Sequence, residues 1–304
     1  MIKIQMTKDP SKANLITHGG TFHADEVMAT VVLGKLLEKI TVCRVSEVPR
    51  YLKKDVIVYD IGGGSFDHHQ IGGNGHRKNG VPYATSGLIW KEYGWKVLKK
   101  YGLPRIVWEK MDKILFQGID AVDNGTMPKV DYPAYVLGLP QQISRFNPCW
   151  DSTEDSDSAF VKAVHYAEIA FDNELKTVAA KTKARRIVEE IISNTEGNIM
   201  VLDTYVSWQE ALFASKSENA QNILFVIYPS NRNDGDYTWY SVPKEYKGAV
   251  PRKGVPEHWK GLEGEHLQTV TGVSGALFCH NEGFVGGAKS LEDAIAMVKI
   301  AIDS

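Results

Sequence analysis

The sequence has few cysteines and no long apolar run. Its 304 residues include three cysteines, Cys43, Cys149 and Cys279, without a Cys-x-x-Cys pair. This odd, widely spaced set argues against a disulfide framework and against a thiolate zinc site. No apolar stretch approaches the ~20 residues that cross a bilayer, and the opening MIKIQMTKDP lacks the apolar core of an export signal. We therefore expect a cytoplasmic protein that does not enter the membrane.

The chain also lacks an excess of charge of either sign. Its 35 Lys and Arg residues face 37 Asp and Glu residues, which gives a net charge of −2 and an isoelectric point near 6.5. No global basic field is present to attract a long polyanion. With 43% apolar and 24% charged residues, the composition is that of a globular protein. The length predicts about two domains.

The first half of the chain alternates between strand and helix patterns. The runs 14–17, 41–45 and 56–61 are apolar and β-branched, whereas residues 25–38 and 87–100 have helical character. Such alternation is typical of a parallel sheet covered by helices. We expect an α/β fold with an N-terminal domain over residues 1–150.

A long segment without glycine or proline follows. Between Cys149 and Glu196, apolar residues such as Phe160, Val164 and Phe171 recur at helical spacing. We therefore predict a helical connector over residues 151–196. Strand-like runs and a final capped helix then predict a smaller α/β domain over residues 197–304, with strands at 222–228, 236–242 and 276–279 and the helix at 292–302.

The loop that leaves the first apolar strand carries His18, His23 and Asp25. Ligands of open parallel sheets bind at the carboxyl ends of the strands, where such loops lie. Two interpretations of this segment alone are equally good. The residues form a ligand set, or they are surface histidines followed by acidic residues that suit the start of a helix.

A second strand ends at Asp60, and Asp67-His68-His69 comes shortly after it. An aspartate at the end of a strand is commonly a turn-former. Adjacent histidines beside two carboxylates are better explained as ligands of a divalent transition metal, with manganese or iron favoured over calcium. This segment therefore predicts a metal site.

A third segment places Asp120 and Asp123 on one helical face, before the helix stop Asn124-Gly125. Asp120 lies in an apolar stretch, where burial is costly unless the carboxylate is paired or bound to metal. It is therefore the better ligand candidate. Asp123 either belongs to the turn or joins Asp120 at the metal.

Several motifs occur in one order along the chain. They are THGGTFHADE, FDHHQ, NGVPYATSGLIW, GIDAVDNG, FNPCWDS and FCHNEGFVGGAKS. In this order they resemble the Myg family of metal-dependent exonucleases, a branch of the DHH phosphoesterase superfamily. The resemblance runs from about Asn14 to about Ile302 and implies a DHH-type N-terminal domain with a smaller substrate domain. His23 stands where the wider superfamily has an aspartate.

The resemblance also implies roles for single residues. Asp60 would bridge two divalent metal ions, with Mn²⁺ expected and Mg²⁺ as the alternative. Asp67 would fix an imidazole, and His69 would face the scissile phosphate. The first ion would be held by His18, His23 and Asp60, and the second by Asp25, Asp60, His68 and Asp120.

The C-terminal domain is expected to hold the substrate. Gly286 and Gly287 precede a capped helix, where bare backbone amides suit a phosphate, although a plain turn explains the pair equally well. The resemblance adds substrate contact by His280. Arg252 matches a family arginine and is expected to clamp a phosphate.

These observations predict a metal-dependent 3′–5′ exonuclease that acts on RNA or other single-stranded nucleic acid, with its active site between the two domains. Two metal ions about 4 Å apart would activate water and stabilise the leaving oxygen. The alternatives are a hydrolase of small phosphate compounds, such as pyrophosphate, a cyclic dinucleotide or a very short oligonucleotide, and a non-catalytic binding protein on the same fold. The oligomeric state stays open, and a homo-oligomer is compatible with the sequence.

Overall fold

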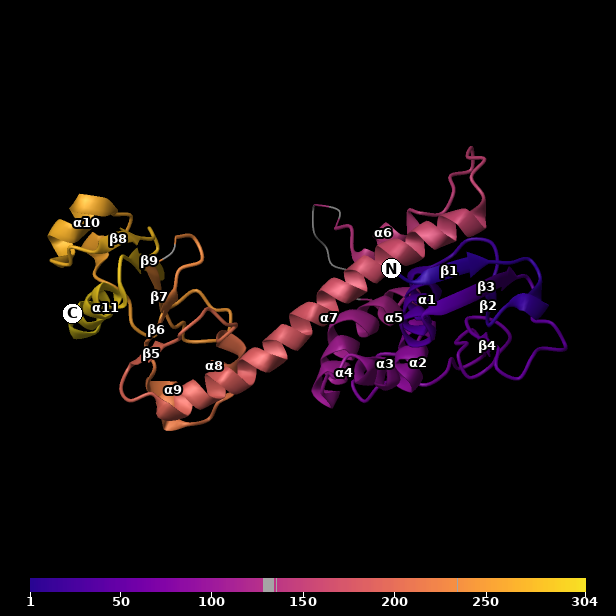
Figure 1. Ribbon diagram of the computed structural model, residues 1–304, viewed down its shortest axis with the longest axis horizontal. Helices are drawn as coiled ribbons and strands as arrows, with labels where there is room; N and C mark the ends of the chain where they lie inside the picture. Colours follow the sequence, from indigo (N-terminus) through magenta and orange to yellow (C-terminus); the bar gives the residue numbers. More distant parts are fainter. Residues whose placement is uncertain (128–133, 135, 234) are drawn as a thin grey trace. The chain divides into compact units, whose positions relative to one another are not determined.

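The computed structural model describes residues 1–127, 134, 136–233 and 235–304. These residues form two compact units, Met1–Ala179 (unit 1) and Ala180–Ser304 (unit 2). Each unit has its own sheet, with unit 1 in indigo to magenta and unit 2 in orange to yellow (Figure 1). Within the described residues, no helix combines the length and the apolar character that a membrane span requires.

Unit 1 is built on a parallel sheet of four strands in the order β1-β3-β2-β4. The two strands that carry the candidate site, β2 and β4, are direct neighbours, with Leu15 opposite Ile57. Because both run in the same direction, their carboxyl ends meet at one edge of the sheet. The predicted mixed α/β fold with a parallel sheet is confirmed. The strands are β1 (Lys3–Met6), β2 (Leu15–His18), β3 (Lys39–Val45) and β4 (Ile57–Val58).

Helices bury the sheet of unit 1. The helix α1 (Ala24–Leu37), which the sequence predicts at 25–38, is buried along its first eleven residues, as expected for a helix with apolar residues all round. The predicted helix at 87–100 is present as a continuous run that includes one π-helical turn. The other elements are η1 (Pro10–Lys12), α2 (Thr85–Ile89), η2 (Trp90–Gly94), α3 (Trp95–Lys100), α4 (Arg105–Met111), η3 (Asp112–Phe116), α5 (Gln117–Asp123) and α6 (Leu139–Ser144).

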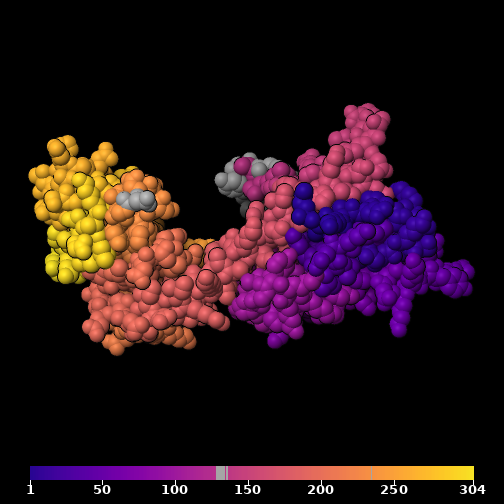
Figure 2. Space-filling model, viewed as in Figure 1, coloured from indigo at the N-terminus to yellow at the C-terminus, as the bar shows by residue number. Residues whose placement is uncertain are grey.

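The long helix α7 (Ser156–Asn194) contributes to both units. Its first half places Phe160 and Phe171 in the core of unit 1, and its last turns place Val188 and Ile192 in a core of unit 2. The boundary between the compact units falls inside this helix, whereas the sequence assigns a connector to 151–196. The segment before α7 stands out from the surface of unit 1 (Figure 2), and its Trp150 is 96% exposed.

Unit 2 contains a mixed sheet in the order β5-β6-β7-β9-β8. Its predicted strands and final helix are confirmed, and the Ser290 hydroxyl caps that helix by accepting a hydrogen bond from the Asp293 amide at 3.0 Å. The elements are β5 (Ile199–Val201), α8 (Gln209–Ala214), α9 (Glu218–Asn222), β6 (Phe225–Pro229), β7 (Tyr237–Ser241), η4 (Glu257–Trp259), α10 (Gly264–Thr271), β8 (Ala276–Cys279), β9 (Val285–Ala288) and α11 (Leu291–Asp303).

Candidate metal centre

The ends of β2 and β4 bring a histidine and an aspartate together. His18 is the last residue of β2, and Asp60 lies two residues beyond β4. The His18 Nε2 atom lies 3.2 Å from Asp60 Oδ2. Asp60 has a φ of 57°, a left-handed conformation that few residues other than glycine adopt. The backbone therefore turns sharply at the point where this carboxylate enters the site.

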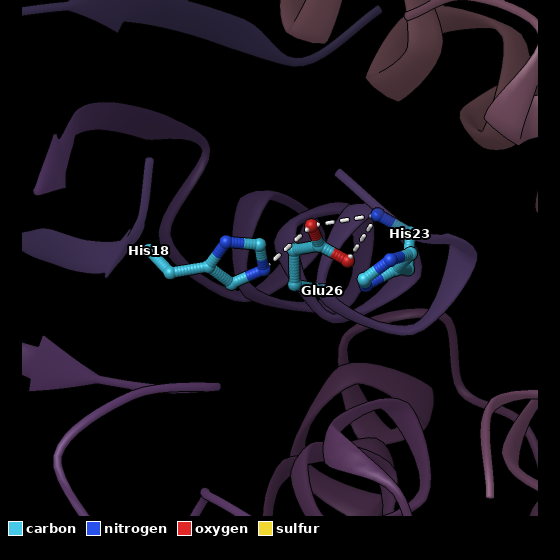
Figure 3. A group of neighbouring side chains, drawn as sticks. All are labelled: His18, His23 and Glu26. Atoms are coloured by element: carbon cyan, nitrogen blue, oxygen red, sulfur yellow. Dashed lines mark hydrogen bonds and ion pairs between the residues drawn. The ribbon is translucent and has the colours of Figure 1, made fainter. Parts of the chain in front are cut away.

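The first turn of α1 adds two fully buried carboxylates, Asp25 and Glu26. Glu26 accepts hydrogen bonds from the His23 backbone N–H at 2.8 and 2.9 Å. One of its oxygens also lies 3.0 Å from His18 Nε2, so the carboxylate sits between the two histidines (Figure 3). The sequence interpretation missed Glu26 as a site residue. The available signal was its position directly before the apolar run 27–33 of the same helix, interrupted only by Thr30.

The double-histidine segment closes the cluster. His68 Nε2 lies 3.4 Å from Asp25 Oδ2 and 3.4 Å from Asp60 Oδ1. Asp67 does not face this cluster directly. Its carboxylate accepts hydrogen bonds from the Gly63 N–H at 2.7 Å and from the His69 N–H at 3.1 Å, and it lies 2.8 Å from His69 Nδ1. Asp67 thus fixes the ring of His69, which is 56% exposed.

The structure separates Asp120 from Asp123. Asp123 Oδ2 lies 3.0 Å from His68 Nε2, so this residue belongs to the cluster. Asp120 instead lies 2.9 Å from Arg77 Nη1 and accepts hydrogen bonds from the Ser86 hydroxyl and the Gly87 N–H. Among the described residues, the groups of possible ligand atoms that lie within 4.8 Å of one another include Asp123 and leave out Asp120. The partner that a buried Asp120 needs is therefore an arginine.

Burial and like charge govern the electrostatics of the carboxylates. Oxygen atoms of Asp25, Glu26 and Asp60 lie within 4.8 Å of one another. Burial, followed by the charge of Asp60, raises the pKa of Asp25 well above its usual value. Burial would also raise the pKa of Asp60, but the His18 and His68 rings and the Thr85 hydroxyl outweigh it and lower that pKa. Burial similarly raises the pKa of Asp120 to about 6, although Arg77 opposes the rise.

For His18 and His68, burial and the neighbouring carboxylates act on the pKa in opposite directions. Burial by itself would lower the pKa of His18, but Asp60 and Glu26 raise it to about 11. Burial likewise opposes protonation of His68, whereas Asp123, Asp25 and Asp60 raise its pKa to about 12. The carboxylates of this cluster thus produce a local negative potential that favours a bound positive charge.

The cluster fits a divalent cation. Four of its ligand atoms are buried and make no hydrogen bond, although oxygen or nitrogen atoms of neighbouring residues lie close: His18 Nε2, Asp25 Oδ1, Asp60 Oδ2 and His68 Nε2. Buried polar atoms are rarely left without partners. Imidazole nitrogens with carboxylate oxygens are a suitable donor set for manganese or another first-row metal. Four overlapping groups of such atoms occur: His18, His23 and Glu26; Asp60, His68 and His69; His23, Asp25 and Asp123; Asp25, Glu26 and Asp60.

A cavity of about 400 Å³ adjoins the cluster. Its wall includes His23, His68, His69 and Asp123, together with further residues of α5 and residues of α6. The exposed ring of His69 therefore lies where a ligand of the cluster would enter. This volume is within the range of small-molecule sites in proteins.

The residues predicted to bind substrate lie in unit 2, and β9 holds two of them. Gly286 and Gly287 are inside this strand, between β7 and β8, so their backbone belongs to the sheet and not to a free loop. A Cβ at Gly286 would meet the Trp239 ring at 2.2 Å, and one at Gly287 would meet the Phe278 ring at 2.7 Å. Both glycines therefore allow aromatic rings to pack against the strand.

His280 and Arg252 have local partners as well. His280 lies in the turn after β8, where its Nδ1 accepts a hydrogen bond from the Glu282 N–H at 3.1 Å. Arg252 Nη1 lies 2.7 to 3.0 Å from the backbone carbonyls of Ala220, Gln221 and Ile223, near the end of α9. The guanidinium thus satisfies carbonyls that a helix end leaves without partners. Substrate contact by these residues stays a prediction.

Comparisons with known proteins agree with the motif order. A family model named for MYG1 exonucleases and described as Uncharacterised protein family (UPF0160) matches residues 14–302. The MYG1 protein of Schizosaccharomyces pombe is 29% identical over 332 residues, which cover 95% of this chain and 97% of the relative. The MYG1 exonuclease of Rattus norvegicus is 30% identical over 321 residues, covering 94% and 84% of the two chains.

The human MYG1 exonuclease is 29% identical over 321 residues, which cover 94% of this chain and 85% of the relative. No solved structure is significantly similar to the chain. The family match spans both units, from the start of β2 to the end of α11. The chain therefore belongs to the MYG1 family.

Proposed function

We propose that this protein is a metal-dependent phosphodiesterase, a 3′–5′ exonuclease that hydrolyses RNA or other single-stranded nucleic acid in the cytoplasm. The observation that carries the proposal is the cluster of buried carboxylates and histidines at the ends of β2 and β4. The names of the rat and human relatives support a nuclease. The resemblance of the motif order to the Myg family supports the DHH-type arrangement, and the direction of cleavage is proposed by analogy with that family.

The groups of ligand atoms support two metal ions that share Asp60. Asp60 occurs in two of the groups, once with His68 and His69 and once with Asp25 and Glu26. His18, which lies 3.2 Å from Asp60, belongs to a third group together with His23 and Glu26. We therefore assign Glu26 and Asp123 to the ligand set beside the residues expected from the family, and remove Asp120 from it.

The chain's own residues would position the substrate phosphate. His69 is exposed at the cavity and its ring is oriented by Asp67, so it would donate a hydrogen bond to a phosphate oxygen. When bound, divalent ions supply charge stabilisation for the phosphate oxygens and lower the pKa of water. The buried side of the cluster, formed by Asp25 and Asp60, keeps the ligands away from bulk water.

The charge balance supports a strand end as substrate. The chain carries a net charge of −2, which gives little attraction for a long duplex. Two divalent ions would add about four positive charges at the site itself. The phosphate at the end of a strand would be attracted locally.

A second candidate function is hydrolysis of a small phosphate compound, such as pyrophosphate, a cyclic dinucleotide or a very short oligonucleotide. The near-neutral net charge favours it, and so does the limited volume of the cavity. Cleavage rates for RNA of 2, 5, 10 and 20 nucleotides separate the two functions. An exonuclease should prefer the longer strands and lose affinity as salt rises, because phosphate contacts release counterions.

The main test is cleavage of a 3′-labelled single-stranded RNA in the presence of Mn²⁺. Asp60→Ala and His68→Ala should each retain less than about 1% of the wild-type rate, because a catalytic ligand is lost. The exposed residues Asp55 and His76 provide matched controls, and Asp55→Ala and His76→Ala should cleave normally. Undiminished cleavage by Asp60→Ala would refute the mechanism. Bound Mn²⁺ without turnover of any phosphodiester would favour a non-catalytic binding protein.

A further inference from the structure

Thr85, the first residue of α2, contacts two of the buried carboxylates. Its hydroxyl donates a hydrogen bond to Asp60 Oδ1 at 2.8 Å, the shorter of its two hydroxyl contacts. Its backbone N–H donates to Asp25 Oδ2 at 3.3 Å. Thr85 is fully buried. One residue thus binds one oxygen of Asp60 and one oxygen of Asp25.

The remaining oxygen of each carboxylate is left without a hydrogen bond. Asp60 Oδ2 and Asp25 Oδ1 are both buried and have no hydrogen-bond partner among the described residues. A carboxylate has two oxygens that can bind metal, and a hydrogen bond to one of them fixes the orientation of the other. Thr85 therefore distinguishes the two oxygens of both side chains.

The position of Thr85 depends on the residues that follow it. Asp120 accepts hydrogen bonds from the Ser86 hydroxyl at 2.6 Å and from the Gly87 N–H at 3.0 Å. Arg77 Nη1 lies 2.9 Å from the second oxygen of this carboxylate, Asp120 Oδ2. A Cβ on Gly87 would come within 1.9 Å of Asp120 Oδ2, so only glycine lets this carboxylate approach. Contacts between Asp120 and the NGVPYATSGLIW motif thus fix the start of α2.

We propose that Thr85 is a positioning residue that orients the Asp60 and Asp25 carboxylates and keeps Asp60 Oδ2 and Asp25 Oδ1 available to a metal ion. The inference rests on the proposed function, because it concerns the same divalent ions. Thr85 itself contacts neither metal nor substrate. Its hydroxyl would hold the Asp60 carboxylate and its backbone amide the Asp25 carboxylate, through the two hydrogen bonds described above.

The test compares Mn²⁺ binding by three forms of the full chain. Thr85→Val has nearly the same shape but lacks the hydroxyl, whereas Thr85→Ser keeps it. Electron paramagnetic resonance of free Mn²⁺ measures the dissociation constant without any substrate. We expect Thr85→Val to raise it about tenfold, as is typical when a residue that orients a metal ligand is lost, and Thr85→Ser to stay within about twofold of the wild type.

The matched control is Thr271→Val in unit 2, a buried threonine whose hydroxyl donates to a backbone carbonyl of its own helix. It should leave Mn²⁺ binding unchanged. If Thr85→Val does not fold, as judged by circular dichroism in EDTA, Thr85→Ala against Thr85→Ser gives the same comparison. Equal Mn²⁺ affinity of the wild type and the variant without the hydroxyl would overturn the proposal.

The two proposals can fail separately. If the wild type binds no Mn²⁺, the metal-dependent function itself is refuted. If it binds Mn²⁺ and cleaves RNA, but removal of the Thr85 hydroxyl changes neither, only the positioning role is lost. A weaker affinity that the serine variant restores supports the role, because a purely structural defect would lower thermal stability and leave the affinity of the folded protein intact.

Discussion

At the scale of single residues, Asp120 and Asp123 differ in the side chains that surround them. They lie three positions apart on α5, so their side chains leave the helix on the same side but at different heights. Asp120 reaches Arg77 and the start of α2, whereas Asp123 reaches His68. Of the two carboxylates in this motif, Asp120 therefore pairs with an arginine, and Asp123 belongs to the candidate metal site.

This difference leads to a prediction for Mn²⁺ affinity. Asp123→Asn should raise the dissociation constant of Mn²⁺ about tenfold or more, because a charged ligand becomes a neutral amide. Asp120→Asn should change it less than about threefold, since the amide oxygen can still accept from Ser86 and Gly87. Calorimetric titration of the metal-free protein measures both. The opposite ranking would return Asp120 to the ligand set.

At the scale of elements, the loop between β2 and α1 is held from two other parts of unit 1. The Arg44 guanidinium of β3 donates to the Gly20 carbonyl at 2.6 Å and lies over the Phe22 and Phe160 rings. The Asn147 amide pairs with both backbone groups of Phe22, accepting from its N–H at 2.9 Å and donating to its carbonyl at 2.8 Å. The FNPCWDS motif thus supports the loop that separates His18 from His23.

The loop contacts predict a local effect of Asn147. Asn147→Ala should destabilise unit 1 by about 1 to 3 kcal/mol, because the backbone groups of Phe22 lose their partners. Amide hydrogen exchange at residues 19–23 should accelerate more than exchange in β1. The control is Asn79→Ala, since Asn79 is exposed and its side chain bonds Gln117 at the surface. Exchange rates that do not change in the loop would contradict this function of Asn147.

The sequence predicted the parts of the site that lie at strand ends. His18 and Asp60 follow apolar strands, so the topology of a parallel sheet was sufficient to bring them together. Glu26 and Thr85 were missed because their roles depend on burial and on contacts between distant segments. Asp120 was predicted as a ligand from its apolar surroundings, and a single sequence does not reveal that Arg77, which lies 43 positions earlier, is beside it.

Unit 2 illustrates the same limit. The strands β6, β7 and β8 were predicted from strand-like runs, and the helix α11 from its cap. The glycine pair was interpreted through its backbone amides, and the sequence did not reveal that aromatic rings from two different strands pack against it. Composition and spacing can predict that a helix or strand forms. The side chains that pack against a glycine depend on contacts between elements, which a single sequence does not reveal.

At the scale of the whole molecule, α7 is the element that both units share. Its first half also anchors the beginning of the chain in unit 1. Glu168 of α7 accepts hydrogen bonds from the Ile2 N–H at 2.9 Å and from Lys35 Nζ at 2.8 Å, and its side chain is 2% exposed. Lys35 also contacts Asp172 on the next turn. One buried carboxylate thus joins the N-terminal segment, α1 and α7.

The charge of Glu168 predicts how the stability of unit 1 depends on pH. Although burial opposes ionisation, Lys35 and the Ile2 N–H hold the pKa of Glu168 below its usual value of 4.5. A carboxyl whose pKa is lower in the folded state stabilises the fold above its unfolded pKa. This contribution is lost as the pH falls from about 4.5 through the lower folded pKa.

Glu168→Gln should therefore lower the free energy of unfolding of unit 1 by about 2 kcal/mol at pH 7 and by progressively less in acid. Pulsed hydrogen exchange of β1 and α1 in a urea series, at pH 7, 5 and 3.5, measures the difference, with exposed Glu109→Gln as the control. A cost for Glu168→Gln that stays constant from pH 7 to pH 3.5 would show that the contribution does not come from the ionised carboxylate.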